Sequence, residues 1–547
     1  MRRTRHWVYI ILLMLPYNII AGVLKGKVTD EKGTTLPYAT VFVESTTIGV
    51  TANGNGDFEL VLVPGLYKVV CQYIGYKQSS FNLSLTGNET IEHVFVLKGQ
   101  SLEMKEVVVH ANSEDPAYAI IRHVIAKRKF HLGQVRSFQT SIYLKGVVRT
   151  RKMPEKLMGQ KVRDDETIVD SAGKGVLYLT EEYADYYASG KSEKTVIHSV
   201  HESGNNNGLG FSKFPPVITF YDNNVNLFGE EQGGRGFISP VSDNAMLYYK
   251  YKLLGQFREQ GNTIYKIRVT QKRAYEPCFN GTIYIVDEDW AIHSLNMTLA
   301  KKSGMDIFDT MRVDQLFLPL QKDNWVIKSQ LQYFTVNLLG IDGTGSFVTV
   351  YNKQKVNEPI PDSTFAGKVT SAYDKSANKK DTGYWKDARP IPLEEDEKRD
   401  FIVKDSVYKK LNDPDRLDSM RRKRNKLKPL GLLTEGYSFS SKKNKNIYKT
   451  NSLLIGLGGD NVVNYNIVEG FNIAPKIHWQ HFIDTGKYLV GDAAVRYGFS
   501  NRHINSVARL YYLTRDRAFR NRAWLFGAEG GKVCLSIQSG EPGIAFF

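Results

Sequence analysis

The sequence predicts a mainly β protein, and three observations lead to that fold class. Short apolar runs separated by Gly, Pro, Asn and Asp recur through the first hundred or so residues. Aromatic residues that favour strands are frequent, with 31 Tyr and 27 Phe, and 46 Gly supply turns. From Gly470 onward the strand-like segments lengthen to about ten alternating residues. We expect an N-terminal Ig-like or prealbumin-like β-sandwich, a mixed β-rich middle region with a few helices, and C-terminal antiparallel strands.

Residues 1–22 have the order of an export signal. Arginines at positions 2, 3 and 5 precede the apolar run Trp7 to Leu15, and small residues Ala21 and Gly22 offer a cleavage site. A short membrane anchor is the alternative, but nine uninterrupted apolar residues are too few to cross about 30 Å of hydrocarbon as a helix. We expect an exported chain without a helical anchor.

Residues 23–99 form the predicted sandwich, followed by a connector at 100–114. Six short runs there read as strands: Lys25 to Val28, Ala39 to Val43, Phe58 to Val63, Tyr67 to Tyr73, Phe81 to Leu85 and Ile91 to Leu97. In the third run Phe58, Leu60 and Leu62 alternate with Glu59 and Val61, which indicates one buried face.

Residues 115–352 form the middle region. Asp115-Pro116 predicts a helix start, because Pro fits the first helical turn. The next segments are strand candidates: Ile264 to Val269, Gly281 to Val286, Trp290 to Leu299 and Trp325 to Phe334. Asn205 to Gly210 and Gly229 to Gly236 are expected to be flexible loops.

The polar residues 353–392 predict an irregular linker, and residues 393–428 a charged helical segment. Beyond it, residues 429–532 contain the long alternating strands, typical of a partial outer-membrane β-barrel. A soluble antiparallel sheet alternates in the same way, so periodicity alone leaves both readings open.

Composition restricts the chemistry. Three cysteines exclude a disulfide scaffold or a four-cysteine zinc module, and we expect Cys71 and Cys278 to be free buried thiols. The formal net charge of +16 favours anionic partners.

The basic run Arg421 to Lys428 lacks interleaved aromatic residues, so we expect no nucleic-acid partner. It reads as a solvated helix end, with contact to anionic headgroups as second reading, and Glu394 to Glu397 reads as a solvated helix start.

No catalytic, cofactor-binding or metal-binding residues are predicted. His198 with His201, and His478 with His481, are spaced H-x-x-H, which is not a zinc-peptidase pattern. Asn53, Asn55 and Asp57 resemble a calcium loop superficially, but the twelfth position is Pro64, so a turn explains them.

Several strings resemble known families. GKVTD (Gly26 to Asp30), LPYATV (Leu36 to Val41) and LEMKEVVV (Leu102 to Val109) are similar to a carboxypeptidase-regulatory-like domain and its connector. Four further strings resemble an envelope family of unknown function that carries this domain and a predicted outer-membrane barrel: DPAYAIIRHVIAKRKFH from Asp115, YWKDARPIPL from Tyr384, IVEGF from Ile467 and RYGFSN from Arg496. The pattern of strand-forming residues in the middle region also resembles that of periplasmic lipoprotein carriers.

The family's barrel continues for several hundred residues more, whereas this chain shows about four convincing barrel strands. When the codons from Lys532 onward are read in a frame shifted by one base, they permit the residues that are usual at this point in the family. We therefore expect a frameshift there, with residues 533–547 as an out-of-frame tail.

The resemblance implies a non-enzymatic cell-envelope protein, exported to the outer membrane, with periplasmic N-terminal domains. Its expected partners are the outer membrane and an envelope glycan or another envelope protein. The alternative is a soluble periplasmic binding or lipoprotein-carrier-like protein. An enzyme with an unfamiliar site is a third reading without residue-level support.

Overall fold

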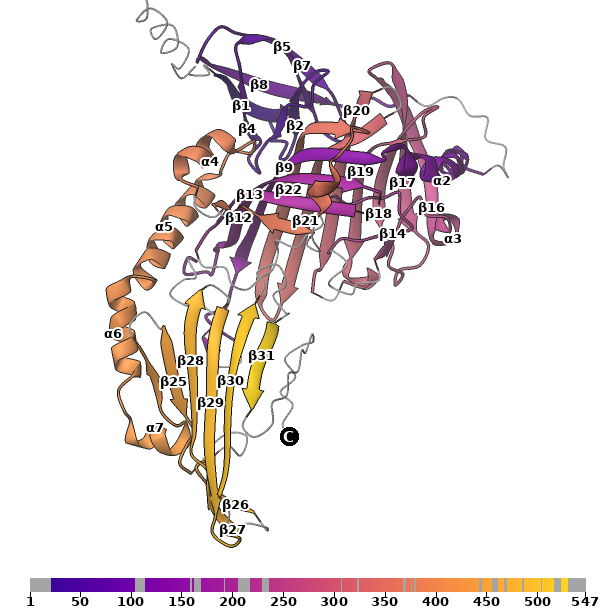
Figure 1. Cartoon of the computed structure of the whole chain (residues 1–547). Helices are drawn as coiled ribbons and strands as arrows, with labels where there is room; N and C mark the ends of the chain where they lie inside the picture. Colours follow the sequence, from indigo (N-terminus) through magenta and orange to yellow (C-terminus); the bar gives the residue numbers. More distant parts are fainter. Residues whose placement is uncertain are drawn as a thin grey trace, which may run out of the picture. The chain divides into compact units, whose positions relative to one another are not determined.

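The structure is a computed structural model (Figure 1). It describes residues 21–103, 114–157, 160–161, 169–190, 192–204, 217–228, 236–305, 307–321, 324–366, 370–374, 376–377, 380–441, 445–454, 461–466, 470–484, 487–502, 504–515 and 523–529. The chain divides into two compact units, residues 1–405 and 406–547, and each is described by itself. Most of the predicted export signal, most of the connector, the loop at 205–210 and the tail 533–547 lie outside the described residues, as does all but Gly236 of the second predicted loop.

The N-terminal sandwich consists of two four-stranded sheets, ordered β4-β1-β8-β6 and β3-β2-β5-β7. Its strands are β1 (Gly22–Asp30), β2 (Thr40–Val43), β3 (Gly49–Thr51), β4 (Asp57–Leu62), β5 (Gly65–Gln72), β6 (Tyr76–Lys77), β7 (Ser79–Leu85) and β8 (Thr90–Gly99). Phe58, Leu60 and Leu62 lie in the core between the sheets, as their alternation predicts. All six predicted strands are confirmed, and β3 and β6 are short additions.

The middle region is one 11-stranded sheet in the order β16-β17-β18-β19-β20-β21-β22-β9-β12-β13-β23. Its strands are β9 (Ser137–Lys152), β12 (Gly175–Ser189), β13 (Ser192–Glu202), β16 (Tyr249–Glu259), β17 (Asn262–Gln271), β18 (Asn280–Val286), β19 (Ile292–Ala300), β20 (Thr310–Gln321), β21 (Asn324–Leu338), β22 (Ile341–Val356) and β23 (Ser371–Tyr373). Smaller elements are β10 (Lys156–Leu157), β11 (Gln160–Lys161), β14 (Asn224–Val225), β15 (Phe237–Ile238), α3 (Ala245–Tyr248) and η3 (Lys301–Ser303). The four strands predicted here are confirmed as β17, β18, β19 and β21.

One face of this sheet is filled by helix α2 (Pro116–Gln134) and the segments around β14 and β15. The helix begins as predicted, because the Asp115 side chain accepts a hydrogen bond from the Ala117 N–H and Pro116 occupies the first turn. Met311 and Val313 of β20 join the same core. Side chains alternate along a strand, so Arg312 and Asp314 point to the opposite face.

The opposite face carries the sandwich and residues 381–405, which we call the strap. Tyr143, Leu331 and Val348 of the sheet share a buried cluster with Trp385 and Ile391 of the strap. Residues 353–392 were expected to be an irregular linker, and the structure corrects this. They contain the end of β22, η4 (Asp362–Phe365), β23 and α4 (Thr382–Ala388). Trp385 is 1% exposed, because its ring completes the core between strap and sheet.

The charged segment predicted at 393–428 forms two helices, α5 (Glu395–Leu411) and α6 (Pro414–Arg424). Asp413 caps α6 and Pro414 stands in its first turn, so the break between the helices follows from the sequence. The two units divide within α5. Among the described residues, no helix is long and apolar enough to cross a membrane.

The second unit contains α6, the short helix α7 (Pro429–Thr434) and an eight-stranded curled sheet. Its strands are β24 (Ser438–Ser440), β25 (Asn446–Thr450), β26 (Val463–Asn466), β27 (Gly470–Ile473), β28 (Lys476–Asp484), β29 (Lys487–Gly498), β30 (Ile504–Arg515) and β31 (Ala523–Glu529). The order is β24-β25-β28-β29-β27-β26, with β30 between β29 and β31. The long alternating strands predicted from Gly470 onward are present. The segment that begins at Gly470 is divided at Pro475 into β27 and β28.

Candidate functional site

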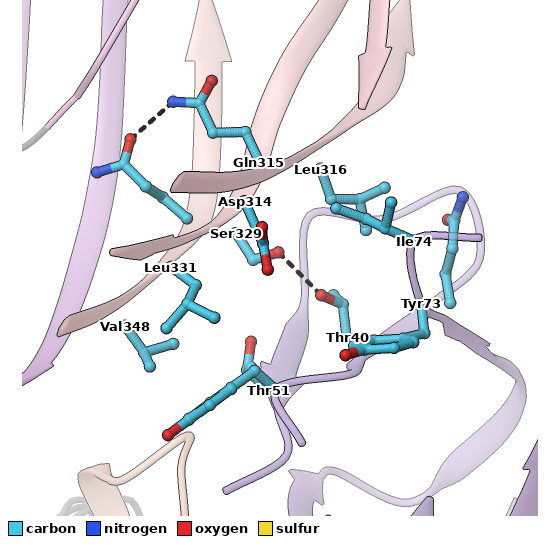
Figure 2. A pocket seen from close by; sticks show the side chains of 13 residues that line it. Thr40, Thr51, Tyr73, Ile74, Asp314, Gln315, Leu316, Ser329, Leu331 and Val348 are labelled. Carbon is cyan, nitrogen blue, oxygen red and sulfur yellow. Dashed lines mark hydrogen bonds between the residues drawn. The ribbon is translucent and has the colours of Figure 1, made fainter. Parts of the chain in front are cut away.

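A crevice lies where the sandwich meets the sheet (Figure 2). The sandwich contributes Thr40 from β2, Thr51 from β3 and the end of β5 with the turn after it, Gln72 to Ile74. The sheet contributes residues of β20, β21 and β22. The crevice encloses about 390 Å³, counting the part open to solvent. It is thus assembled from segments that lie far apart in the sequence.

Polar side chains converge in this crevice from both domains. The hydroxyls of Thr40 and Ser329 are hydrogen-bonded at 2.9 Å across the domain interface. Figure 2 shows the carboxylate of Asp314 and the hydroxyls of Thr51 and Tyr73 directed toward the same space. Polar groups gathered at a domain interface are a common setting for a ligand site.

Asp314 is the main charged group of the crevice. Its Oδ1 accepts a hydrogen bond of 2.5 Å from the Asn296 amide, and its Oδ2 lies 3.2 Å from Arg312 Nε. Burial raises the pKa of Asp314 to about 6, although Arg312 and Asn296 act in the opposite direction. Burial also raises the pKa of Tyr73, and the Asp314 charge adds to that effect.

Four buried polar atoms of residues that line the crevice lack a hydrogen-bond partner among the described residues: Thr51 Oγ1, Gln72 Oε1, Gln315 Oε1 and Gln330 Nε2. The other amide atom of Gln72 is engaged, because Nε2 donates to Glu259 Oε1 at 2.7 Å. The same Glu259 oxygen lies 2.8 Å from His293 Nε2. These three side chains line an adjoining hollow of about 250 Å³, a volume that again counts the part open to solvent.

A buried lysine also bonds the sandwich to the sheet. Lys328 Nζ donates to the Thr47 carbonyl of the sandwich at 2.7 Å, and to the Tyr351 carbonyl and Asn352 Oδ1 of β22. Lys328 is 1% exposed, and burial lowers its pKa to about 7. The sandwich is therefore fixed to the sheet by directional polar bonds rather than by apolar contact alone.

The strap covers a second polar cluster. Glu397 is fully buried, with Lys145 Nζ at 2.5 Å and Arg149 Nη2 at 2.9 Å. Arg149 also contacts Glu394 and Asp396. The expectation of a solvated helix start at Glu394 to Glu397 is therefore wrong for Glu394 and Glu397, because cations of β9 lie beneath them. Glu395 remains largely exposed, at 89%, and Asp396 is half exposed.

The YWKDARPIPL string lies in the strap and its role is visible. Arg389 makes a bidentate ion pair with the fully buried Glu181 of β12. Its Nε lies 2.7 Å from Oε1 and its Nη2 lies 2.8 Å from Oε2. Tyr143 donates to the same carboxylate at 2.5 Å. The Gly54 N–H of the sandwich donates to Glu394. The strap thus joins the sandwich, the sheet and the start of α5, which is a structural role.

The histidine pairs singled out in the sequence have separate partners. His198 lies between Asp185 and Asp374, at 3.0 and 2.9 Å, while His201 stacks on Phe401 with ring centroids 4.0 Å apart. His478 contacts Asp492 and His481 contacts Asn446. Within the described ranges, no group of three or more His, Cys, Asp or Glu is placed to hold a metal ion.

The remaining sequence candidates have structural explanations. Asn53 Oδ1 accepts hydrogen bonds from the N–H groups of Asn55 and Asp57, so the predicted turn is confirmed. Cys71 and Cys278 are free and buried, as predicted.

The basic run from Arg421 is only partly solvated. Asn425 donates to the Ser440 carbonyl and accepts from the Ser440 N–H, and Arg421 donates to the same carbonyl. Lys423, Arg424 and Lys426 are exposed. The predicted helix end is therefore not only solvated. Its side chains also hydrogen-bond the backbone groups on the outer edge of β24.

The strand register gives the curled sheet one mainly apolar face and a second face that carries the charged residues together with apolar ones such as Phe482, Val490 and Val507. Cross-strand partners place the following residues on one face: Tyr448, Ile477, Trp479, Leu489, Gly491, Ala493, Val495, Tyr497, Ile504, Ala508, Leu510 and Tyr512. The charged residues of the same stretches lie on the other face: Lys449, Lys476, Asp492, Arg496 and Arg509. Ile477, Val495 and Leu510 of the apolar face are at least half exposed. A soluble sheet would bury such a face.

Three family models match the chain. A CarboxypepD_reg-like domain matches residues 24–109. The Family of unknown function (DUF5686) matches residues 120–354, and the C-terminal domain of that family matches residues 430–545. No curated protein matches.

Several solved structures have chains that are similar to part of this one. A DUF1329 family protein from Desulfovibrio piger is 11% identical, with a TM-score of 0.21, and the match covers 46% of this chain and 97% of that one. A LolA superfamily protein from Nitrosomonas europaea is 11% identical, with a TM-score of 0.18, and coverage of 46% and 97%. At such scores these likenesses carry no argument about function.

Proposed function

This chain belongs to the Family of unknown function (DUF5686), and from that premise we propose that it is an exported, non-enzymatic cell-envelope protein. Its curled C-terminal sheet would be part of an outer-membrane barrel, and the sandwich and middle region would be periplasmic. The export-signal pattern of residues 1–22 supports the destination. The sandwich would serve as an interaction module toward an envelope glycan or protein.

The two faces of the curled sheet are the observation that carries this proposal. A membrane strand alternates lipid-facing apolar residues with polar residues on the inner side. Ile477, Val495 and Leu510 lie on one face of three adjacent strands and remain exposed. Lipid is the environment that removes this surface from water.

The experiment compares two lysine substitutions in the same strand. Ile477 lies on the apolar face and Gln480 on the polar face of β28. On a lipid-facing position near the midplane, Lys costs about 2–4 kcal/mol. We expect Ile477→Lys to lower the urea-resistant membrane fraction of the expressed protein, while Gln480→Lys leaves it unchanged.

A soluble sheet predicts another outcome. Ile477 is 55% exposed, so Ile477→Lys would be tolerated in water as well as Gln480→Lys. Wild-type protein recovered wholly in the soluble periplasmic fraction would refute the membrane assignment.

The alternative of a soluble lipoprotein-carrier-like protein has less support. A carrier needs an open apolar space for a lipid chain. Here Ile121, Val124 and Phe220 fill the apolar face of the middle sheet and are fully or almost fully buried. A lipid would have to displace helix α2.

A further inference from the structure

We propose that the basic end of helix α6, residues 421–428, binds the headgroups of anionic phospholipids at the membrane surface. The inference rests on the proposed function, because it takes the apolar face of the curled sheet as the face that meets lipid. Two independent observations support it. One is the set of cations gathered in this segment, and the other is its attachment to the sheet at one border of the apolar face.

The end of α6 carries a dense positive charge. Residues 419–428 contain six Lys or Arg and no Asp or Glu. Asp418, just before them, is already paired with Arg421 and Arg422, at 2.7 and 3.1 Å. Three lysines of the segment are exposed and bonded to none of the described residues: Lys423, Lys426 and Lys428. Each such cation close to anionic headgroups strengthens membrane binding roughly fivefold.

Exposed apolar side chains lie among these cations. Met420 is 56% exposed and Leu427 is 61% exposed. A bilayer surface takes cations at its phosphates and apolar side chains between its headgroups. A soluble polyanion, such as an acidic glycan, takes the cations alone. The combination therefore favours a membrane surface over a soluble polyanion.

Hydrogen bonds fix the last turn of α6 to one residue of the curled sheet, Ser440 of β24. Asn425 donates to the Ser440 carbonyl at 2.7 Å and accepts from the Ser440 N–H at 2.8 Å. Arg421 donates to the same carbonyl, and Arg424 donates to the Ser440 hydroxyl. The place of Ser440 along its strand therefore sets the level at which the basic segment meets the sheet.

That level coincides with a row of aromatic side chains on the apolar face. Phe439, the neighbour of Ser440, lies opposite Tyr448, and Tyr448 lies opposite Trp479 of β28. Aromatic residues form girdles at both borders of the lipid-facing band of a membrane sheet. On that assignment the row marks the headgroup level, and the basic end of α6 stands at it.

A second aromatic row lies at the other end of the same face. The strand register places Tyr465, Phe471 and Tyr497 there. Small and apolar residues lie between the two rows: Ile477, Ala493, Val495 and Ala508. Gly491, opposite Trp479, is six residues from Tyr497 on β29, which is roughly 20 Å at about 3.4 Å per residue. This length is comparable to the apolar band of about 25 Å in membrane sheets.

The test follows hydrogen exchange of peptides from residues 414–428 in the full chain, reconstituted into vesicles. The probes are phosphatidylcholine vesicles with and without phosphatidylglycerol, at about 0.1 M and about 1 M salt, where the Debye length is about 10 and about 3 Å. Lipid that binds the folded helix suppresses its local opening. We expect at least tenfold slower exchange with phosphatidylglycerol at the lower salt concentration, and no difference at the higher one.

A triple variant removes the unpaired cations. We expect Lys423→Gln, Lys426→Gln and Lys428→Gln together to abolish the protection that depends on phosphatidylglycerol. Exchange in phosphatidylcholine vesicles should not change, because these side chains have no partner to lose among the described residues. The matched control makes the same change of charge at three exposed lysines of the first unit: Lys32→Gln, Lys77→Gln and Lys302→Gln. It should keep the protection of wild type.

Three results would overturn the inference. They are equal exchange of α6 in both kinds of vesicle at low salt, wild-type protection in the triple variant of α6, and equal protection by dextran sulfate in solution. The last result would identify a soluble polyanion as the partner.

Failure of the proposed function gives a different result. A chain that urea strips from the vesicles, yet whose α6 is protected by phosphatidylglycerol through these lysines, contradicts only the barrel assignment. A urea-resistant membrane protein without that protection contradicts only the headgroup contact.

Discussion

Glu397→Gln tests whether the strap is held by its buried ion cluster. Glu397 is 0% exposed and contacts Lys145 and Arg149 at 2.5 and 2.9 Å. Removing one partner of a buried pair costs about 3–5 kcal/mol, because a buried charge is left uncompensated. Arg149 keeps Asp396 and Lys145 keeps the Pro392 carbonyl, so we expect the lower end, about 3 kcal/mol.

The assay is hydrogen exchange on peptides from residues 384–404, because local opening can be measured without unfolding the whole chain. A loss of about 3 kcal/mol corresponds to roughly a hundredfold faster exchange through local opening. Glu395→Gln is the matched control: Glu395 is 89% exposed and pairs only with Lys398 among the described residues, so exchange should change little.

A double variant separates charge from packing. Replacing Lys145 and Glu397 together by Met removes both charges, so most of the lost protection should return. If Glu397→Gln exchanges like wild type, the ion cluster does not hold the strap and the reasoning fails.

Three further predictions concern single contacts. Asp115→Ala should lower the free energy of unfolding by about 1–2 kcal/mol in urea titration, because Asp115 both caps α2 and accepts from the Leu253 N–H; no change would contradict the capping role. Lys328 has its folded-state pKa lowered to about 7, so wild type should lose stability relative to Lys328→Met as pH falls from about 10 to 7, with a flat difference below. Asp314 has its folded-state pKa raised to about 6, so wild type should lose stability relative to Asp314→Asn as pH rises from about 4 to 6. Melting temperatures across pH check both, and differences that run the other way would reject the assigned pKa directions.

The sequence predicted the local elements well, because each depends on neighbours along the chain. Alternation at Phe58, Leu60 and Leu62 identifies β4 without any knowledge of the rest of the fold. Asp115-Pro116 identifies the start of α2 in the same way. The long strands of the second unit were also predictable from alternation, although periodicity could not tell which environment their apolar face meets.

The candidate site could not be predicted, because its partners are distant in sequence. Glu397 reads as a surface residue until Lys145 and Arg149, about 250 positions earlier, are placed beneath it. Thr40 and Ser329 likewise meet only once the sandwich docks. Asp314 lies on β20 two residues after Arg312, so its charge alone did not mark this strand as part of a crevice.

The position of β9 in the large sheet determines the order in which the chain can complete its structure. β9 is flanked by β12, its near neighbour in sequence, and by β22, whose residues emerge about 200 positions later. A chain that emerges from its N-terminus leaves one edge of β9 unpaired until Val356 has appeared. Lys145 and Glu181 gain their charged partners only after the strap has emerged. During that interval the middle region is an open sheet with unpaired charges and an unpaired strand edge, and such an edge is free to pair with another chain.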